Sequence, residues 1–280
     1  MLPVTAWIWM PSAITTGNSM AIQLQPQSTD LEQWVMLAQR ENAAFEVMDP
    51  FSLSGVGDFG KHKILAEQFR KTGMAASLHG AFIDVNPASG DPDFRELSRR
   101  RCRESCEIAS ALGAGNLVFH SSAFPFLRGA YLENWAAGCA SFYEELAERY
   151  PMRIFIENAQ DLDPIPLRKL MERLGSDSVS VCLDIGHIHY SRAPVSQWFE
   201  ELGDWVGYLH LSDNMGHFDD HLPLGKGSID WELVNQLWKS LGRDIPITLE
   251  TGDLQSTKES LSFLRRNGYF GLKGNIHEQL

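Results

Sequence analysis

Short apolar runs alternate with longer amphipathic segments along most of the chain. The apolar runs predict eight buried strands, near residues 20–25, 43–48, 74–79, 115–120, 152–157, 178–184, 205–211 and 245–250. The amphipathic segments between them predict eight helices, near residues 30–42, 58–73, 93–113, 130–149, 164–174, 194–203, 229–241 and 256–267. Regular alternation of strand and helix is typical of an α/β fold with a parallel sheet.

Eight strand–helix units in about 250 residues fit one (β/α)8 barrel, the TIM barrel. A doubly wound open sheet is the alternative, but no GxGxxG motif follows the first strand. We therefore expect residues 1–280 to form a single barrel domain, with an irregular lead over residues 1–19. Local signals support several helix ends: capping-box patterns at Asp93-x-x-Glu96 and Ser256-x-x-Glu259, Pro164 in a first turn, and Gly113 as a helix stop.

Composition narrows the class of protein. Hydrophobic residues make up 44% of the 280 residues, which is ample for a large core, and the formal net charge is −12. That charge argues against a nucleic acid partner chosen by bulk electrostatics, although it leaves a local basic or metal-lined groove open. No apolar segment is long enough to cross a membrane, and the N-terminus lacks the pattern of a signal peptide. We expect a cytoplasmic protein whose cysteines (Cys102, Cys106, Cys139 and Cys182) are buried thiols.

Metal-binding residue types end most of the predicted strands. The residues at these positions are His79, His120, Glu157, Asp184, His210 and Glu250. A single strand-end histidine is more often structural, but a carboxylate such as Glu157 is costly to bury unless it is paired or bound to a metal. Because all strands of a parallel barrel end at one rim, the presence of metal-binding residues at the ends of six strands predicts a metal centre there.

Two short spacings add further candidate ligands. His187 follows Asp184 by three residues, and Asp219 and His221 are separated by one residue in a glycine-bounded loop. Asp213 is expected to orient a ligand or cap a turn rather than bind metal. Imidazole and carboxylate ligands without thiolate suit Zn²⁺ or Mn²⁺ better than Ca²⁺. The nine candidates exceed the needs of one ion, so either several ions bind or some residues contact substrate.

In combination, these motifs resemble the xylose isomerase-like TIM barrel superfamily over residues 20–265. The segments that carry the resemblance are LHGAFIDVN, LVFHSS, IFIEN, CLDIGH, YLHLSDN, DDHLPLGKGSIDW and ITLET. That superfamily includes sugar isomerases and epimerases and the endonuclease IV-type apurinic endonucleases. The resemblance implies one of two sites, which differ in the number of metal ions.

An isomerase-type site would hold one ion on Glu157, Asp184, His210 and Glu250, with Glu157 and Glu250 also acting as the acid/base pair and His187 contacting substrate. The ion would lower the cost of an enediolate while a carboxylate moves the carbon-bound proton. An endonuclease-type site would hold up to three zinc ions and would add the ligands His79, His120, His187, Asp219 and His221.

The loop motifs LDIGH and HLPLGKGSIDW resemble the isomerase/epimerase branch more closely. We therefore expect a metal-dependent isomerase or epimerase of a small sugar or sugar derivative, with the zinc phosphoester hydrolase as the alternative. A non-catalytic metal-binding barrel is a second alternative, disfavoured because Glu157 and Glu250 are both intact. Arg128 and Lys226 are further candidates for substrate binding. Homo-oligomers are common among proteins that this chain resembles.

Overall fold

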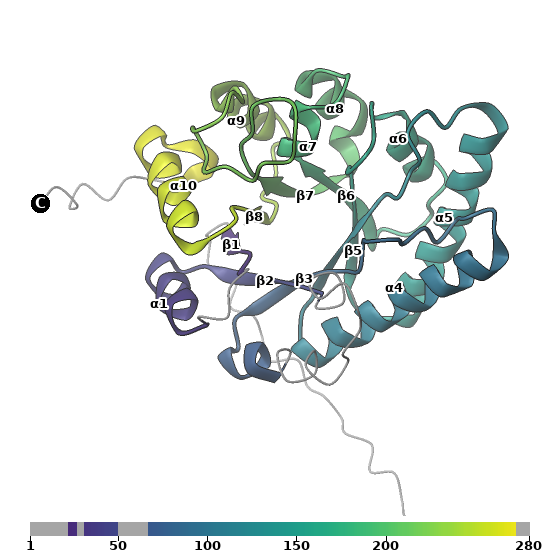
Figure 1. Cartoon of the computed structure of the whole chain (residues 1–280), viewed down its shortest axis with the longest axis horizontal. Helices are drawn as coiled ribbons and strands as arrows, with labels where there is room; N and C mark the ends of the chain where they lie inside the picture. The colour runs from purple at the N-terminus through teal and green to yellow at the C-terminus, as the bar shows by residue number, and fades with distance from the viewer. Residues whose placement is uncertain (1–21, 27–30, 50–66, 273–280) are drawn as a thin grey trace, which may run out of the picture.

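The computed structural model describes residues 22–26, 31–49 and 67–272. Within them, eight parallel strands close into a barrel in chain order, and β1 pairs with both β2 and β8. Viewed down the barrel, the helices form a ring outside the strands (Figure 1). The (β/α)8 barrel predicted from the alternating pattern is confirmed.

Each strand lies within the range that the apolar runs predicted. The strands are β1 (Ile22–Leu24), β2 (Ala44–Met48), β3 (Ala75–His79), β4 (Asn116–His120), β5 (Arg153–Glu157), β6 (Val179–Asp184), β7 (Val206–Leu211) and β8 (Ile247–Leu249). The buried apolar side chains form one large core cluster, and a small second cluster consists of Val118, Phe155, Cys182 and Tyr208. All four cysteines are buried thiols, as predicted.

The helices alternate with the strands as predicted, except that a short extra helix, α7, follows β6. They are α1 (Leu31–Glu41), α4 (Pro92–Leu112), α5 (Gly129–Arg149), α6 (Ile165–Met171), α7 (Ile185–His189), α8 (Val195–Leu202), α9 (Trp231–Ser240) and α10 (Leu254–Asn267), with 3₁₀ turns η1 (Gly203–Trp205) and η2 (Tyr269–Gly271). Residues 67–72 are also helical, at the end of the range predicted near 58–73. The short helix α7 was not predicted. None of the helices in the described part of the chain has the length and apolarity to span a bilayer.

Two predicted helix starts were wrong by a few residues. The cap of α4 is Asp91, whose side chain accepts hydrogen bonds from the backbone N–H groups of Asp93 and Phe94. The cap of α10 is Asp253, which accepts in the same way from Gln255 and Ser256. In each case an aspartate two or three residues upstream accepts hydrogen bonds from the unpaired backbone N–H groups of the first turn. The predicted capping residue, Asp93 or Ser256, therefore lies inside the helix and donates one of these hydrogen bonds through its own backbone N–H.

Other boundary signals were read correctly. Gly113 ends α4 in the left-handed conformation, with φ of 76°, which glycine adopts without steric cost. Pro164 lies at the start of α6, where a missing N–H costs nothing. The predicted lead over residues 1–19 lies outside the described residues.

Candidate metal centre

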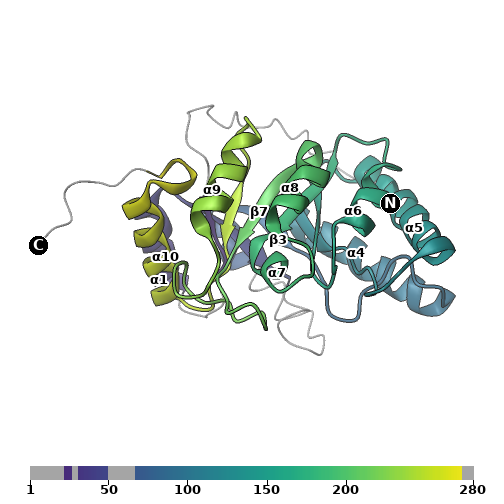
Figure 2. The same ribbon diagram turned by 90° about the horizontal axis from the view of Figure 1, so that it is seen from above.

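The strand-end residues meet because the parallel strands all end at the same rim of the closed barrel. His120 is the register partner of Glu157, and Asp184 is the register partner of His210. In the side view, α7 and the segment between β7 and α9 lie toward one end of the barrel (Figure 2). The carboxyl ends of the strands therefore bring all of the predicted ligands to one rim.

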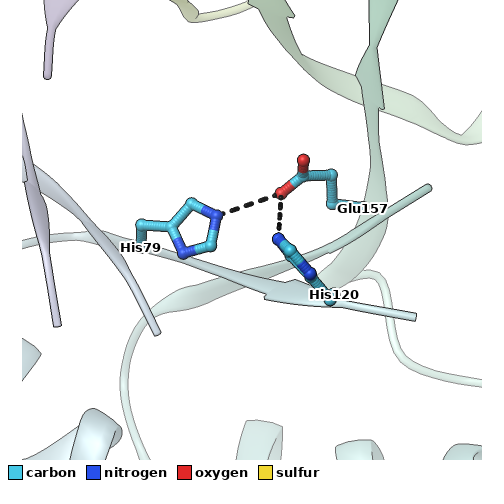
Figure 3. Close-up of side chains that lie close together, drawn as sticks. All are labelled: His79, His120 and Glu157. Atoms are coloured by element: carbon cyan, nitrogen blue, oxygen red, sulfur yellow. Dashed lines mark ion pairs between the residues drawn. The ribbon is translucent and has the colours of Figure 1, made fainter. Parts of the chain in front are cut away.

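Glu157 lies at the centre of this group and is completely buried. Its Oε2 is 3.3 Å from Nε2 of His79 and 3.6 Å from Nε2 of His120. Figure 3 shows the two imidazoles pointing from neighbouring strands toward this one carboxylate. Nδ1 of His210, on β7, approaches the same oxygen to 3.5 Å.

The ligand atoms fall into groups with the spacing of a metal site. In three sets, one ligand atom from each residue lies within 4.8 Å of the others: His79, His120 and Glu157; His79, His210 and Glu250; and Glu157, Asp184, His210 and Glu250. The four-residue set is buried throughout. It provides three carboxylates and one imidazole, a combination suited to Mn²⁺ or Zn²⁺.

Three of these four residues carry buried polar atoms without hydrogen bonds. Both carboxylate oxygens of Glu157, Oδ2 of Asp184 and Nδ1 of His210 are buried and make no hydrogen bond within the described structure. Such atoms are costly unless something else satisfies them. No lysine or arginine among the described residues is buried. A divalent cation would satisfy these atoms and balance the carboxylates, so the donor set fits a metal ion.

Asp184 has two roles at this rim. Its Oδ1 accepts a hydrogen bond of 2.6 Å from the backbone N–H of His187 and so caps α7. Its Oδ2 is buried without a hydrogen bond, and Asp184 contributes one oxygen to the four-residue set. Because α7 starts directly at this cap, His187 is buried at the rim and is not a surface histidine.

A further cluster, outside these three sets, joins His187 to the loop between β7 and α9. Oδ2 of Asp219 lies 3.2 Å from Nε2 of His187 and 3.0 Å from Nε2 of His221. Each of these rings has its Nδ1 2.7 Å from a backbone carbonyl, that of Asn158 for His187 and that of Glu250 for His221. A carbonyl only accepts hydrogen bonds, so each Nδ1 donates and each Nε2 faces the shared carboxylate.

The surroundings shift the protonation of the candidate ligands. Burial, reinforced by the carboxylates of Glu157 and Glu250, raises the pKa of Asp184 to about 7 despite nearby His187. Burial lowers the pKa of His120 to about 3, which leaves a neutral ring. Burial acts in the same direction on His79, but Glu157 outweighs it and raises the pKa of His79 to about 9. In the absence of metal, protons therefore occupy part of the site.

Two buried residues beside the site were missed from the sequence. Glu46 lies in β2 with no exposed surface, and Gln25 follows β1 and is also buried. Gln25 donates hydrogen bonds from Nε2 to both Glu46 and Glu250. The signal was present in the run AFEVM, because a carboxylate inside an apolar strand carries the same burial cost that singled out Glu157.

The other predicted residues have simpler surroundings. Arg128 is largely exposed and forms an ion pair of 2.9 Å with Asp163. Lys226 is exposed in a turn between β7 and α9. Asp213 holds this turn, since its carboxylate accepts from the backbone N–H of Gly225 at 2.8 Å and from Nε1 of Trp231 at 2.9 Å. Asp213 therefore caps a turn, as expected.

Comparisons with known proteins agree with this architecture. The model of the xylose isomerase-like TIM barrel family matches residues 42–267. An uncharacterized protein of Methanocaldococcus jannaschii is 27% identical over 199 residues, which are 67% of this chain and 68% of that protein. A probable endonuclease 4 of Chlorobium phaeovibrioides is 29% identical over 211 residues, which are 66% of this chain and 74% of that protein.

Among solved structures, one described as a D-tagatose 3-epimerase-like protein superposes with a TM-score of 0.68 and 24% identity, covering 88% of this chain and 96% of that one. At that identity the likeness supports the fold alone. The family match extends over most of the barrel and includes every predicted ligand. The chain belongs to the xylose isomerase-like TIM barrel family.

Proposed function

We propose that this protein is a divalent-metal-dependent isomerase or epimerase that acts on a small sugar or sugar derivative. The observation that carries this proposal is the convergence of unsatisfied buried atoms on Glu157, Asp184 and His210, within one set that Glu250 completes. These four residues are the ones that a one-ion isomerase site requires. Of the four remaining candidate histidines, three have Nδ1 in contact with a backbone carbonyl: His79, His187 and His221.

Glu157 and Glu250 supply the acid and base of the proposed reaction. Both approach the same nitrogen of His210, with Glu157 Oε2 3.5 Å and Glu250 Oε1 3.2 Å from its Nδ1. One carboxylate removes the proton from the carbon next to the substrate carbonyl, and the other returns a proton to the product. A bound divalent ion would stabilise the negative charge that develops on the substrate oxygens. His187, buried beside Glu157, is positioned to contact a substrate hydroxyl.

The rim favours a small substrate over a polyanion. In the described loops that follow the strands, the exposed charged side chains are acidic Asp84, Asp91, Asp219, Asp220, Asp230 and Asp253 and basic Arg128, Arg192 and Lys226. Of the three cations, Arg128 already pairs with Asp163, and the guanidinium of Arg192 lies over the ring of Phe126. Binding to DNA depends on many cation–phosphate contacts, and this excess of acidic groups opposes them.

A second candidate is a multinuclear zinc phosphoester hydrolase. The cluster of His187, Asp219 and His221 favours it, because two imidazoles share one carboxylate oxygen next to the four-residue set. The relative named probable endonuclease 4 is consistent with this chemistry. In this reading His79 and His120 would also bind metal, through the group that they form with Glu157.

One experiment distinguishes the two functions. The protein is purified without chelator or added metal, its metal content is measured by elemental mass spectrometry, and it is incubated with a panel of ketoses in D₂O. The proposed function predicts one ion per chain and deuterium incorporation at a carbon next to the carbonyl. Two or three zinc ions, with no exchange on any ketose and cleavage of abasic-site DNA, would establish the second candidate instead.

A further inference from the structure

We propose that Glu46 is a positioning residue that holds His210 in the orientation and tautomer needed to bind the metal ion. This inference rests on the metal centre of the proposed function. Glu46 lies in the middle of β2 and is fully buried. Its carboxylate lies inside the barrel on the opposite side of the His210 ring from Glu157 and Glu250, because it contacts Nε2 while they approach Nδ1.

The carboxylate of Glu46 is saturated by donors. It accepts from the Tyr208 hydroxyl at 2.7 Å, from Thr248 Oγ1 at 3.2 Å and from Gln25 Nε2 at 3.3 Å. Nε2 of His210 completes the set at 3.2 Å. Four donors, from the two strands β7 and β8 and from the segment after β1, occupy the acceptor positions of one carboxylate. Glu46 therefore acts as an acceptor beneath the site rather than as a metal ligand.

The contact with Glu46 decides which nitrogen of His210 faces the site. A carboxylate only accepts hydrogen bonds, so Nε2 of His210 carries the proton that it donates to Glu46. Nδ1 is then the nitrogen that faces Glu157 and Glu250, and it makes no hydrogen bond in the described structure. It is therefore the nitrogen that would bind a metal ion held between these two carboxylates.

A second branch ties Glu250 to the same carboxylate. Nε2 of Gln25 donates both to Oε1 of Glu46 and to Oε1 of Glu250. Glu46 thus fixes His210 directly and Glu250 through one intervening amide. Partners of this kind behind a metal-binding histidine contribute about 10- to 100-fold to metal affinity.

The test measures Zn²⁺ affinity by competition with a chromogenic chelator, without substrate. Glu46→Gln removes the charge and turns an acceptor into a donor, so we expect Zn²⁺ binding about 10- to 100-fold weaker than in the wild type. Glu46→Asp keeps the carboxylate and should recover part of the loss. Tyr208→Phe is the matched control, because it removes one hydrogen bond to Glu46 and leaves the carboxylate and His210 in place. Its melting temperature should fall while its Zn²⁺ affinity stays within about threefold of the wild type.

Wild-type Zn²⁺ affinity in Glu46→Gln would overturn the inference. An equal loss of affinity in Glu46→Gln and Tyr208→Phe would also overturn it, because it would show that both residues only stabilise the barrel interior. If Glu46→Gln does not fold, Glu46→Asp is compared with Tyr208→Phe instead. A positioning role of Glu46 requires Glu46→Asp, which shortens the carboxylate, to weaken Zn²⁺ binding more than Tyr208→Phe does. Failure of the proposed function is a separate result: the wild type would bind Zn²⁺ and show the Glu46 effect, yet exchange no proton on any sugar.

Discussion

His120 ends β4 directly opposite Glu157 at the end of β5, and the two residues are register partners. Their side chains approach to 3.6 Å, between Nε2 and Oε2. Between β6 and β7 the pairing shifts by one residue after Val181, and this shift brings Asp184 opposite His210. The geometry of the candidate centre therefore depends on strand register as much as on residue type.

Replacing Glu157 by glutamine should abolish activity and leave the fold intact. The substitution keeps the shape of the side chain but removes the charge that the metal requires and the group that moves the proton. We expect turnover to fall at least about 1000-fold, in line with the loss of a general base together with a ligand. Steady-state kinetics and circular dichroism would check this, with the exposed Glu148→Gln as control. Retained turnover would contradict the assignment of the site.

Replacing His79 by alanine should leave the metal content at one ion per chain. In the proposed one-ion site, the four-residue set would hold the ion without His79. We expect the loss of His79 at most to weaken substrate binding. Elemental mass spectrometry of the purified variant would measure the ratio, and Asp184→Asn, which removes one of the four ligands, should lose the ion. A metal content that falls by one ion in His79→Ala would support the multinuclear hydrolase.

Metal affinity should rise with pH through about 7, and the raised pKa of His210, another of the four ligands, extends the rise to higher pH. The pKa of Asp184 is raised from its ordinary value of 3.8 to about 7, so below that pH the folded, metal-free protein keeps a proton that the metal must displace. One displaced proton weakens binding by about tenfold for each pH unit below 7. Chelator competition at several pH values would measure the slope, and calorimetry in two buffers would count the protons released.

The same shifts predict the opposite trend for stability without metal. Asp184 and His79 bind protons more tightly in the folded chain than in the unfolded one, since the pKa of each is raised. Their stabilising contribution is complete below the unfolded pKa and is lost as the pH rises through about 7 for Asp184 and about 9 for His79. Melting temperatures of the chelator-treated protein should therefore fall between pH 6 and 9, and a rise would contradict the shifts.

Replacing Gly207 by alanine should destabilise the barrel and disturb the site. Gly207 is the unpaired residue of the register shift between β6 and β7. A Cβ there would lie 2.9 Å from the ring of Phe155 and 3.1 Å from Cβ of Ser180. We expect a loss of about 1–3 kcal/mol in the free energy of unfolding, typical of overpacking in a core, together with weaker metal binding.

Chemical denaturation would measure that loss. Gly115→Ala is the control, because a Cβ at Gly115 meets no atom within 4 Å. Equal stability of the two variants would show that the barrel accommodates a side chain at the shift.

The sequence by itself determined the architecture and the residue types of the site. Strand and helix periods differ, so the alternation of patterns was sufficient for a (β/α)8 barrel. Glu157 stood out because an apolar run cannot bury a carboxylate without a partner. Helix caps were less secure, as Asp91 and Asp253 show, because several nearby polar residues compete for the same backbone donors.

Only the tertiary structure decided how these residues are combined. The register shift at Gly207 sets which ligands face each other, and register depends on packing between strands that are distant in the chain. Asp184 both caps α7 and presents an oxygen to the centre, a double role that its spacing from His187 does not reveal. Glu46 reaches His210 across the barrel interior, and the sequence does not record that contact, because it exists only once the barrel has closed.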